Sequence, residues 1–362
     1  MPTVGSPVNG MKHMLAFLRL TRPLNLLIIV GTMMAMRFGV VSAYLEYESA
    51  AMTVMSNDPQ GTLLNAVPGN TLHHAFPITY FWLLVLSTVL IAAGGNVIND
   101  YFDTRIDRVN KPNELIVGRT VKRRVAMAGH LVLSSLGLLL SAVVAWRSGQ
   151  LKWVAIPVFA IATLWYYSTT MKRSFLVGNG AIALLSALVP LTIGLYEVTT
   201  LARAYPTHVV LSTTQGQELP VAFDFNIPWF WILGYSAFAF LTTLVREIQK
   251  DMADVKGDLA DGCRTLPIVI GRTWSKVIAI GYLLITLIGV LALRMLVLHD
   301  RLSYWYIGFI VIGPLLLSMG FTYNAITRRE FNTAGNLVKV AMVVAVAYAF
   351  LMNRTLWNPS LL

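Results

Sequence analysis

The sequence predicts an all-α integral membrane protein, and three observations lead to this fold class. Hydrophobic residues make up 56% of the 362-residue chain and charged residues only 12%, against roughly 25% charged residues in an ordinary soluble domain. The mean hydropathy of the chain is +0.65. Apolar runs of about 20 residues recur along the sequence, and each can cross a hydrocarbon core of roughly 30 Å as a helix.

Nine such runs predict nine membrane-spanning helices in one membrane domain that covers residues 1–362. We place them at residues 15–38, 78–98, 125–146, 153–170, 176–196, 229–245, 277–298, 304–323 and 337–352. Two connections between the runs are long, polar and contain Pro and Gly, near residues 44–74 and 199–227. We expect both of them to be insertions on the outer side, remote from the chemistry.

The distribution of basic residues predicts the orientation. With the amino terminus inside, 21 of the 28 Lys and Arg residues fall on the cytoplasmic side, as the positive-inside rule requires. An odd number of helices then leaves the carboxyl terminus outside. We therefore expect a multi-pass protein of the cytoplasmic membrane. The net charge of +11 comes from short loops rather than a basic face, so no nucleic-acid partner is expected.

Two acidic clusters stand at the ends of apolar runs on the predicted cytoplasmic side. Residues 99–107 read NDYFDTRID, and residues 251–258 read DMADVKGD. Carboxylates beside a membrane are costly unless a cation neutralises them. At about 100° per residue, a helix continued through each cluster gathers the polar side chains on one side. These are Asn96, Asn99, Asp100, Asp103 and Asp107 in the first cluster, and Glu247, Lys250, Asp251, Asp254 and Asp258 in the second.

The oxygen atoms of the two clusters predict one shared site for Mg²⁺ and a phosphorylated substrate. Mg²⁺ usually binds through one or two carboxylates together with waters and phosphate oxygens. The alternative is that the carboxylates are solvated helix ends, paired with neighbours such as Arg105 and Lys256. Two clusters on the same membrane side favour the metal site. No P-loop or GxGxxG motif supports ATP-driven or nicotinamide chemistry, and the single Cys263 excludes a Cys-based metal site.

The spacing within and around the clusters matches a known pattern. Residues 99–107 fit an NDxxDxxxD motif, and residues 254–258 fit a DxxxD motif. Smaller matches are Arg22-Pro23-Leu24-Asn25, Tyr167 with Met171-Lys172-Arg173, Gly178-Asn179, and the loop 110–119, in which Glu114-Leu115 replaces an expected Arg-Pro pair. In these features the chain resembles the UbiA superfamily of intramembrane prenyltransferases. The resemblance implies a single UbiA-type bundle of nine helices.

The resemblance also implies Mg²⁺-dependent transfer of a prenyl group from an allylic diphosphate to a membrane acceptor. The implied metal ligands are Asn99, Asp103, Asp107, Asp254 and Asp258. These aspartates, Asp100 and Lys172 are expected to act in catalysis, by stabilising the leaving diphosphate electrostatically. The expected substrate-binding residues are Asn25, Asn96, Arg119, Tyr167, Lys172, Arg173, Lys250 and Asp251.

The acceptor is expected to be a glycerol-phosphate lipid such as geranylgeranylglyceryl phosphate, and the transferred group geranylgeranyl. The stretch 246–258, followed by Arg264-Thr265-Leu266-Pro267, is similar to the branch of the superfamily that uses this acceptor. Quinone-forming members more often have Tyr at the position of Arg246. Prenylation of an aromatic acceptor of the 4-hydroxybenzoate or naphthoate type stays an alternative, and a cation-coupled transporter is a second one. No obligate protein partner is indicated.

Overall fold

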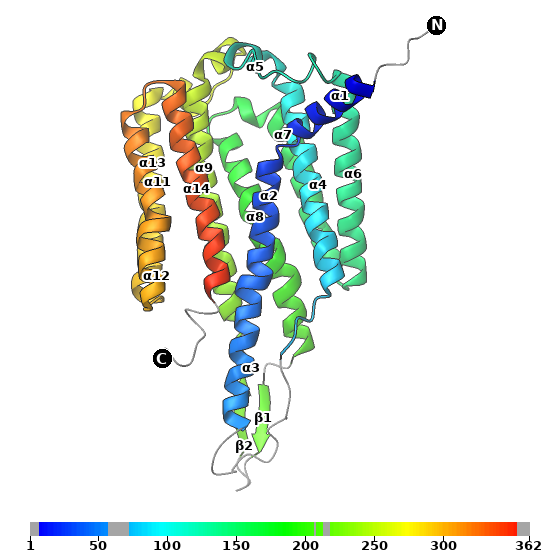
Figure 1. Ribbon diagram of the computed structural model, residues 1–362, viewed down its shortest axis with the longest axis vertical. Helices are drawn as coiled ribbons and strands as arrows, with labels where there is room; N and C mark the ends of the chain where they lie inside the picture. Colours follow the sequence, from blue (N-terminus) through cyan, green and yellow to red (C-terminus); the bar gives the residue numbers. More distant parts are fainter. Residues whose placement is uncertain (1–6, 57–71, 206–207, 213–217, 353–362) are drawn as a thin grey trace.

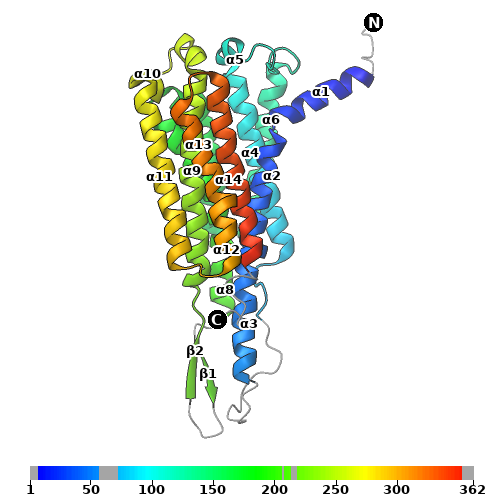
Figure 2. The same cartoon turned by 60° about the vertical axis from the view of Figure 1, so that its left-hand side comes forward.

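A computed structural model describes residues 7–56, 72–205, 208–212 and 218–352 of the chain. In this part, nine helices are long and apolar enough to cross a membrane, which confirms the predicted fold class. Figures 1 and 2 show the long helices running side by side in one bundle. The short helix α5 lies at one end of the bundle, and α3 with a two-stranded hairpin projects from the opposite end.

The elements follow one another along the chain in a nearly unbroken series of helices. They are α1 (Pro7–Leu20), α2 (Pro23–Met34), η1 (Ala35–Val41), α3 (Ser42–Ser56), α4 (Ile78–Phe102), α5 (Thr104–Asn110), α6 (Arg123–Arg147), η2 (Leu151–Val154), α7 (Ala155–Thr169), η3 (Met171–Arg173), α8 (Val177–Ala204), β1 (His208–Ser212), β2 (Glu218–Ala222), α9 (Asn226–Ala260), α10 (Leu266–Val269), α11 (Gly271–Leu296), α12 (Arg301–Trp305), η4 (Tyr306–Val311), α13 (Ile312–Asn324), α14 (Arg328–Tyr348) and η5 (Ala349–Leu351).

The first predicted span, residues 15–38, is wrong at its start. Helix α1 ends at Leu20, and α2 begins separately at Pro23. Between them Arg22 has a φ of 54°, a left-handed conformation that is unfavourable for a residue with a side chain. Proline at the first helical position then starts α2 in a new direction. As a result α1 leaves the bundle at an angle at the α5 end (Figure 1).

The two polar connections contain more regular structure than the sequence suggests. Helix α2 passes through the π-helical segment η1 into α3, so residues 44–56 are helical, and residues 57–71 lie outside the described part. Helix α8 continues to Ala204, and β1 and β2 then pair antiparallel. This hairpin was not predicted. Each of its strands has only five residues, and a two-stranded hairpin is marginal by itself.

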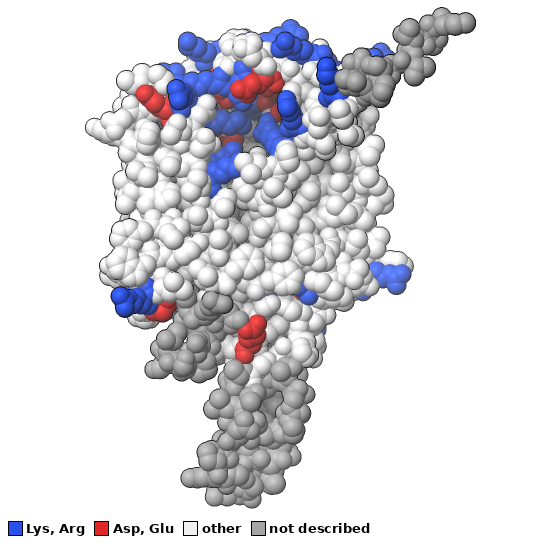
Figure 3. Space-filling view, viewed as in Figure 1, with Lys and Arg blue, Asp and Glu red and all other residues white. Residues whose placement is uncertain are grey.

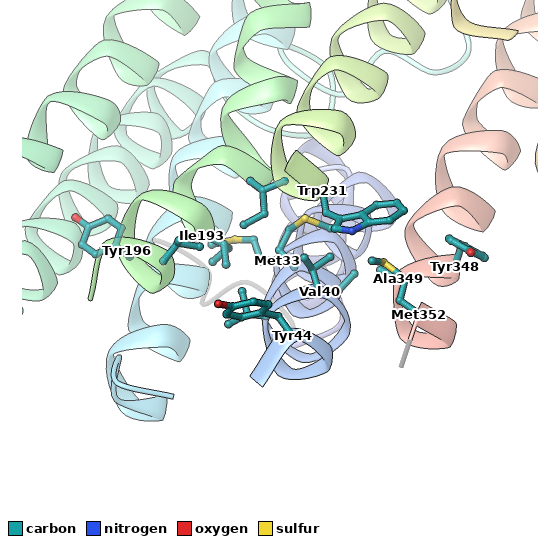
Figure 4. Close-up of a cluster of buried hydrophobic side chains, with 14 of the residues drawn as sticks. Met33, Val40, Tyr44, Ile193, Tyr196, Trp231, Tyr348, Ala349 and Met352 are labelled. Carbon is teal, nitrogen blue, oxygen red and sulfur yellow. The ribbon is translucent and has the colours of Figure 1, made fainter. Parts of the chain in front are cut away.

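The largest buried apolar cluster joins α2, η1, α8, α9 and α14. Figure 4 shows Met33, Val40, Ile193, Trp231 and Tyr348 among its members. In a membrane such contacts stabilise the bundle through van der Waals packing, because lipid is as apolar as the side chains. The packed cluster holds the helices together.

One charged network is buried in the same half of the bundle. The Arg37 guanidinium pairs with Glu197, and its Nη2 atom donates to the Phe76 carbonyl at 2.8 Å. His74 Nδ1 lies 3.3 Å from the Glu197 carboxylate. Burial, together with the charge of Arg37, lowers the pKa of His74 to about 4. The imidazole is therefore neutral at pH 7, and the Arg37 charge neutralises Glu197.

Candidate active site

The two acidic clusters lie next to each other at the α5 end, because α5 packs against α9. The link is the side chain of Asn110, the last residue of α5. Its Nδ2 atom donates to the Asp254 carbonyl at 3.1 Å, and its Oδ1 atom accepts from the Gly257 amide at 3.0 Å. Glycine is required at position 257, since a Cβ atom there would lie 2.6 Å from Asn110 Cγ. The contact fixes the first cluster against the second.

We expect Gly257→Ala to destabilise the protein by about 1–3 kcal/mol, because an added methyl group overpacks the contact between α5 and α9. The measurement is the thermal unfolding midpoint in detergent. Gly281→Ala in α11 is the matched control, because a Cβ atom there meets nothing within 4 Å and alanine favours the helix. Equal midpoints for the two variants would show that α5 does not pack against α9 in this way.

Asp103 is the centre of the first cluster. Helix α4 ends at Phe102, and Asp103 forms a turn before α5. Its Oδ2 atom accepts from Asn99 Nδ2 at 2.8 Å and pairs with the Lys172 ammonium group. Burial acts to lower the pKa of Lys172, but the Asp103 carboxylate outweighs it and raises that pKa above its ordinary value. Lys172 therefore keeps its positive charge.

The turn that carries Lys172 is held against α8 by another close approach. Gly178 lies in the first turn of α8, where a Cβ atom would lie 2.8 Å from the Met171 carbonyl oxygen. The following residue, Asn179, donates to Asp251 Oδ2 at 2.8 Å. Leu176, just before α8, has a φ of 56°, a strained conformation of the kind that gathers at functional sites. The α7–α8 connection thus contacts both acidic clusters.

Four other acidic groups at this end are paired with basic side chains, three of them from other elements. Arg22 Nη2 donates to Asp100 Oδ1 at 2.6 Å, and Arg328 Nη2 lies 3.1 Å from Asp254 Oδ1. Burial acts to lower the pKa of Arg22, but the carboxylates of Asp100 and Asp103 outweigh it, so the pKa is raised. Further pairs are Lys250 with Glu247 at 3.3 Å and Arg173 with Asp261 at 2.9 Å.

The acidic groups do not form a complete metal site by themselves. Within the described ranges, no three His, Cys, Asp or Glu side chains come together closely enough to hold a metal ion. Two features nevertheless suit a hard cation. The Asn99 Oδ1 atom is buried without a hydrogen-bond partner in the described structure. Burial raises the pKa of Asp107, and the nearby Asp103 carboxylate raises it further, so added positive charge is favoured there.

A polar cleft of ≈ 1640 Å³ opens at the α5 end beside these groups. Figure 3 shows basic and acidic side chains gathered around a hollow in this face, above a band of uncharged surface. Nine basic and four acidic residues line the cleft in the described structure: Lys12, Arg19, Arg22, Lys111, Arg119, Arg246, Lys250, Arg328 and Arg329, with Asp100, Asp107, Glu114 and Asp254. The excess of positive charge favours an anionic ligand.

An apolar pocket of ≈ 270 Å³ lies between α2, α4, α7, α8 and α9, next to the polar cleft. Asn25 and Arg246 line both cavities. From this junction the apolar pocket runs past Ile91 and Leu164 to Trp153 and Tyr196. Together the cavities can hold a ligand with an anionic head and a hydrocarbon tail.

Not every predicted site residue takes part in the polar contacts. Asn99, Asp103, Lys172, Asp251 and Arg173 do so as described above. Asn96 donates to the Thr21 carbonyl at 2.9 Å, and Tyr167 is buried close to Lys172. Asp258 is 4% exposed and lies near Lys172 and Asp103. Arg119 is exposed at the rim of the cleft and makes no side-chain hydrogen bond or ion pair in the described structure.

Several polar residues of the site were absent from the predicted set: Arg22, Asn110, Asn179, Arg328 and Lys339. Four of them had a usable signal. Arg22, Asn110 and Asn179 lie in the smaller motif matches, and Lys339 is a lone basic residue inside the predicted span 337–352, where an ionisable residue indicates function by default. Nothing in the sequence indicated Arg328, because its partner Asp254 is more than 70 residues away.

The family resemblance of the motifs is confirmed by comparison with known proteins. A family model described as the UbiA prenyltransferase family matches residues 70–340. The digeranylgeranylglyceryl phosphate synthase of Natronomonas pharaonis is 29% identical to the chain over 272 residues, which cover 75% of this chain and 83% of the relative.

Solved structures agree on the fold. A structure described as digeranylgeranylglyceryl phosphate synthase in membranes has a TM-score of 0.55 and 20% identity, covering 93% of this chain and 99% of the other. A UbiA homologue from Archaeoglobus fulgidus, bound to GPP and Mg²⁺, has a TM-score of 0.50 and 16% identity, covering 92% and 99%. At such identities the likeness establishes a shared arrangement of helices.

Proposed function

The chain belongs to the UbiA prenyltransferase family. From this premise we propose that it transfers a geranylgeranyl group from geranylgeranyl diphosphate to a glycerol-phosphate lipid of the membrane. Membership makes the chain a multi-pass membrane prenyltransferase. The observation that carries the finer proposal is the junction of a positively charged cleft with an apolar pocket at Asn25 and Arg246. Such a junction suits a substrate with a charged head and a long hydrocarbon chain.

We propose that the donor diphosphate binds between the two acidic clusters with Mg²⁺. Asn99, Asp103, Asp107, Asp254 and Asp258 are the residues that would hold the metal. Mg²⁺ when bound would neutralise the charge that develops on the leaving diphosphate. The Archaeoglobus fulgidus homologue binds GPP and Mg²⁺, which supports the metal dependence. The acidic clusters do not supply a complete set of metal ligands, which suits an ion that takes its remaining ligands from phosphate and water.

The chain's own residues then act by position and charge. As the allylic C–O bond breaks, the diphosphate leaves with the bonding electrons. Lys172 carries a permanent positive charge beside Asp103. It stabilises the oxygen atoms of the leaving diphosphate without changing its own protonation state. The buried ring of Tyr167 forms part of the wall of the site and helps exclude water from the allylic cation. The acceptor hydroxyl oxygen forms the new C–O bond, and its proton passes to the released diphosphate.

The relatives support the choice of acceptor. The named relative makes digeranylgeranylglyceryl phosphate, which supports a glycerol-phosphate lipid as acceptor in this chain. Arg246 lines the junction of the two cavities, where quinone-forming relatives more often have Tyr. No described feature favours an aromatic acceptor, and the family gives no support to a cation-coupled transporter.

We also propose that all nine spans serve this one active site, and that the α5 end faces the cytoplasm. Basic residues are concentrated at that end and are few on the rest of the face shown in Figure 3, which supports the orientation by the positive-inside rule. The donor would then arrive from the cytoplasm and the acceptor from the membrane.

A panel of acceptors tests the function. Purified protein in detergent receives Mg²⁺, geranylgeranyl diphosphate and one acceptor, and diphosphate release is measured. We expect release with geranylgeranylglyceryl phosphate and little with 4-hydroxybenzoate or a naphthoate. Turnover with only the aromatic acceptors would overturn the acceptor proposal. A protein that is folded but inactive with the whole panel would overturn the transferase proposal.

A further inference from the structure

Two basic side chains that line the apolar pocket form no ion pair in the described structure. Arg246 is half-buried, and in the described structure it has no side-chain hydrogen bond and no ion pair. Lys339 is also half-buried, and its Nζ atom donates to a neutral amide, Asn25 Oδ1, at 2.6 Å. Both residues line the apolar pocket. By contrast, Arg22, Lys172, Lys250 and Arg328 each have a carboxylate within 3.3 Å.

Arg246 and Lys339 come from different helices but lie close together. The Arg246 side chain passes Gly335 of α14, where a Cβ atom would lie 3.7 Å from Arg246 Cγ. Lys339 is one helical turn beyond Gly335 on the same side of α14. Its charge is near enough to those of Arg246 and Arg22 for the three to repel one another. The Glu247 carboxylate attracts Arg246, but neither cation forms an ion pair in the described structure, and a cation inside a membrane-spanning bundle is costly without one. An anionic ligand would remove that cost.

The pair is displaced along the bundle from the aspartates expected to hold the metal. Asp254 is eight residues beyond Arg246 on α9, a rise of about 12 Å. Lys339 of α14 reaches across to Asn25 of α2, and Figure 3 shows a charged hollow in the face that carries these two helices. An anion bound here is therefore distinct from a diphosphate held at the clusters, and it can arrive from the membrane.

We propose that Arg246 and Lys339 form a second anion site, which binds the phosphate of the membrane acceptor while its hydrocarbon chain stays in lipid or in the apolar pocket. The inference rests on the proposed function for the identity of that acceptor. A guanidinium group binds two phosphate oxygens in parallel, and an ammonium group adds a point charge. Asn25, now bonded to Lys339, supplies an amide beside them. Fixing the phosphate orients the glycerol hydroxyl towards the donor.

The test combines kinetics with binding in the absence of the donor. The variants are Arg246→Gln and Lys339→Gln, with Arg246→Lys as the conservative change. Arg124→Gln is the matched control, because Arg124 is an exposed arginine that lines neither cavity. We expect each Gln variant to raise the KM and the Kd for geranylgeranylglyceryl phosphate about tenfold or more, as for loss of a charged hydrogen bond. The KM for the donor should stay within about twofold, and Arg246→Lys should keep most of the affinity.

The unphosphorylated alcohol geranylgeranylglycerol separates recognition of phosphate from a general defect. Its Kd should be the same for the wild type and the Gln variants. A rise in the donor KM in place of the acceptor KM, or equal loss of alcohol and phosphate binding, would overturn the anion site. If the wild type binds the acceptor without turnover, the proposed function fails, while the Kd comparison still decides the anion site. Normal turnover and unchanged Kd in both Gln variants would leave the function standing and overturn the site.

Discussion

Asp103→Asn is expected to lower prenyl-transfer turnover by a factor on the order of 10²–10³, the loss typical for a group that stabilises developing charge. Asp103 is buried at 5% exposure, and it holds both Asn99 and Lys172. The amide keeps the size of the side chain but removes the anionic oxygen that a metal ion needs. Diphosphate release under saturating substrates measures the effect.

Two controls accompany this measurement. Glu114→Gln removes an exposed carboxylate from the rim of the same cleft and should leave turnover within about twofold. The thermal unfolding midpoint of Asp103→Asn shows whether the variant is folded, since Lys172 loses its anionic partner. A folded Asp103→Asn protein with near-normal turnover would show that the donor does not bind at the first cluster.

Chelation of divalent cations is expected to abolish turnover and leave the fold intact. The fold does not depend on the metal, because basic groups of the chain already neutralise the acidic ones: Lys172 pairs with Asp103, Arg22 with Asp100 and Arg328 with Asp254. We expect EDTA to reduce diphosphate release to background and Mg²⁺ to restore it. The unfolding midpoint should shift by no more than about a degree, which corresponds to about 1 kcal/mol or less for a chain of this length.

Inorganic diphosphate sharpens the same experiment. The described acidic groups do not complete a metal site, so Mg²⁺ alone should hardly raise the unfolding midpoint. Mg²⁺ with diphosphate should raise it, because a ligand that binds only the folded state stabilises it. A large rise with Mg²⁺ alone would mean that the protein holds the ion without phosphate. Full activity in EDTA would contradict metal dependence.

The helix boundaries show where sequence patterns lose information. Hydropathy predicted the span 229–245, but α9 continues from Asn226 to Ala260 and carries the second acidic cluster. It likewise missed the first turns of α14, which begin at Arg328 with a capping box formed by Thr327 and Glu330. Hydropathy detects only the part of a helix that lies in hydrocarbon. The active-site helices extend beyond the hydrocarbon into polar surroundings. There a helix does not need apolar side chains, so hydropathy does not detect it.

The sequence by itself determined the fold class, the nine spans and the motif residues of both acidic clusters, because span length and motif spacing are local properties of the chain. Tertiary structure alone decided which cation neutralises which acid, and that Asn110 joins α5 to α9. It also decided that Arg246 and Lys339 line the same apolar pocket. These contacts join residues tens to hundreds of positions apart, and charge pairing depends on distances of a few ångströms. Only the packed bundle sets such distances.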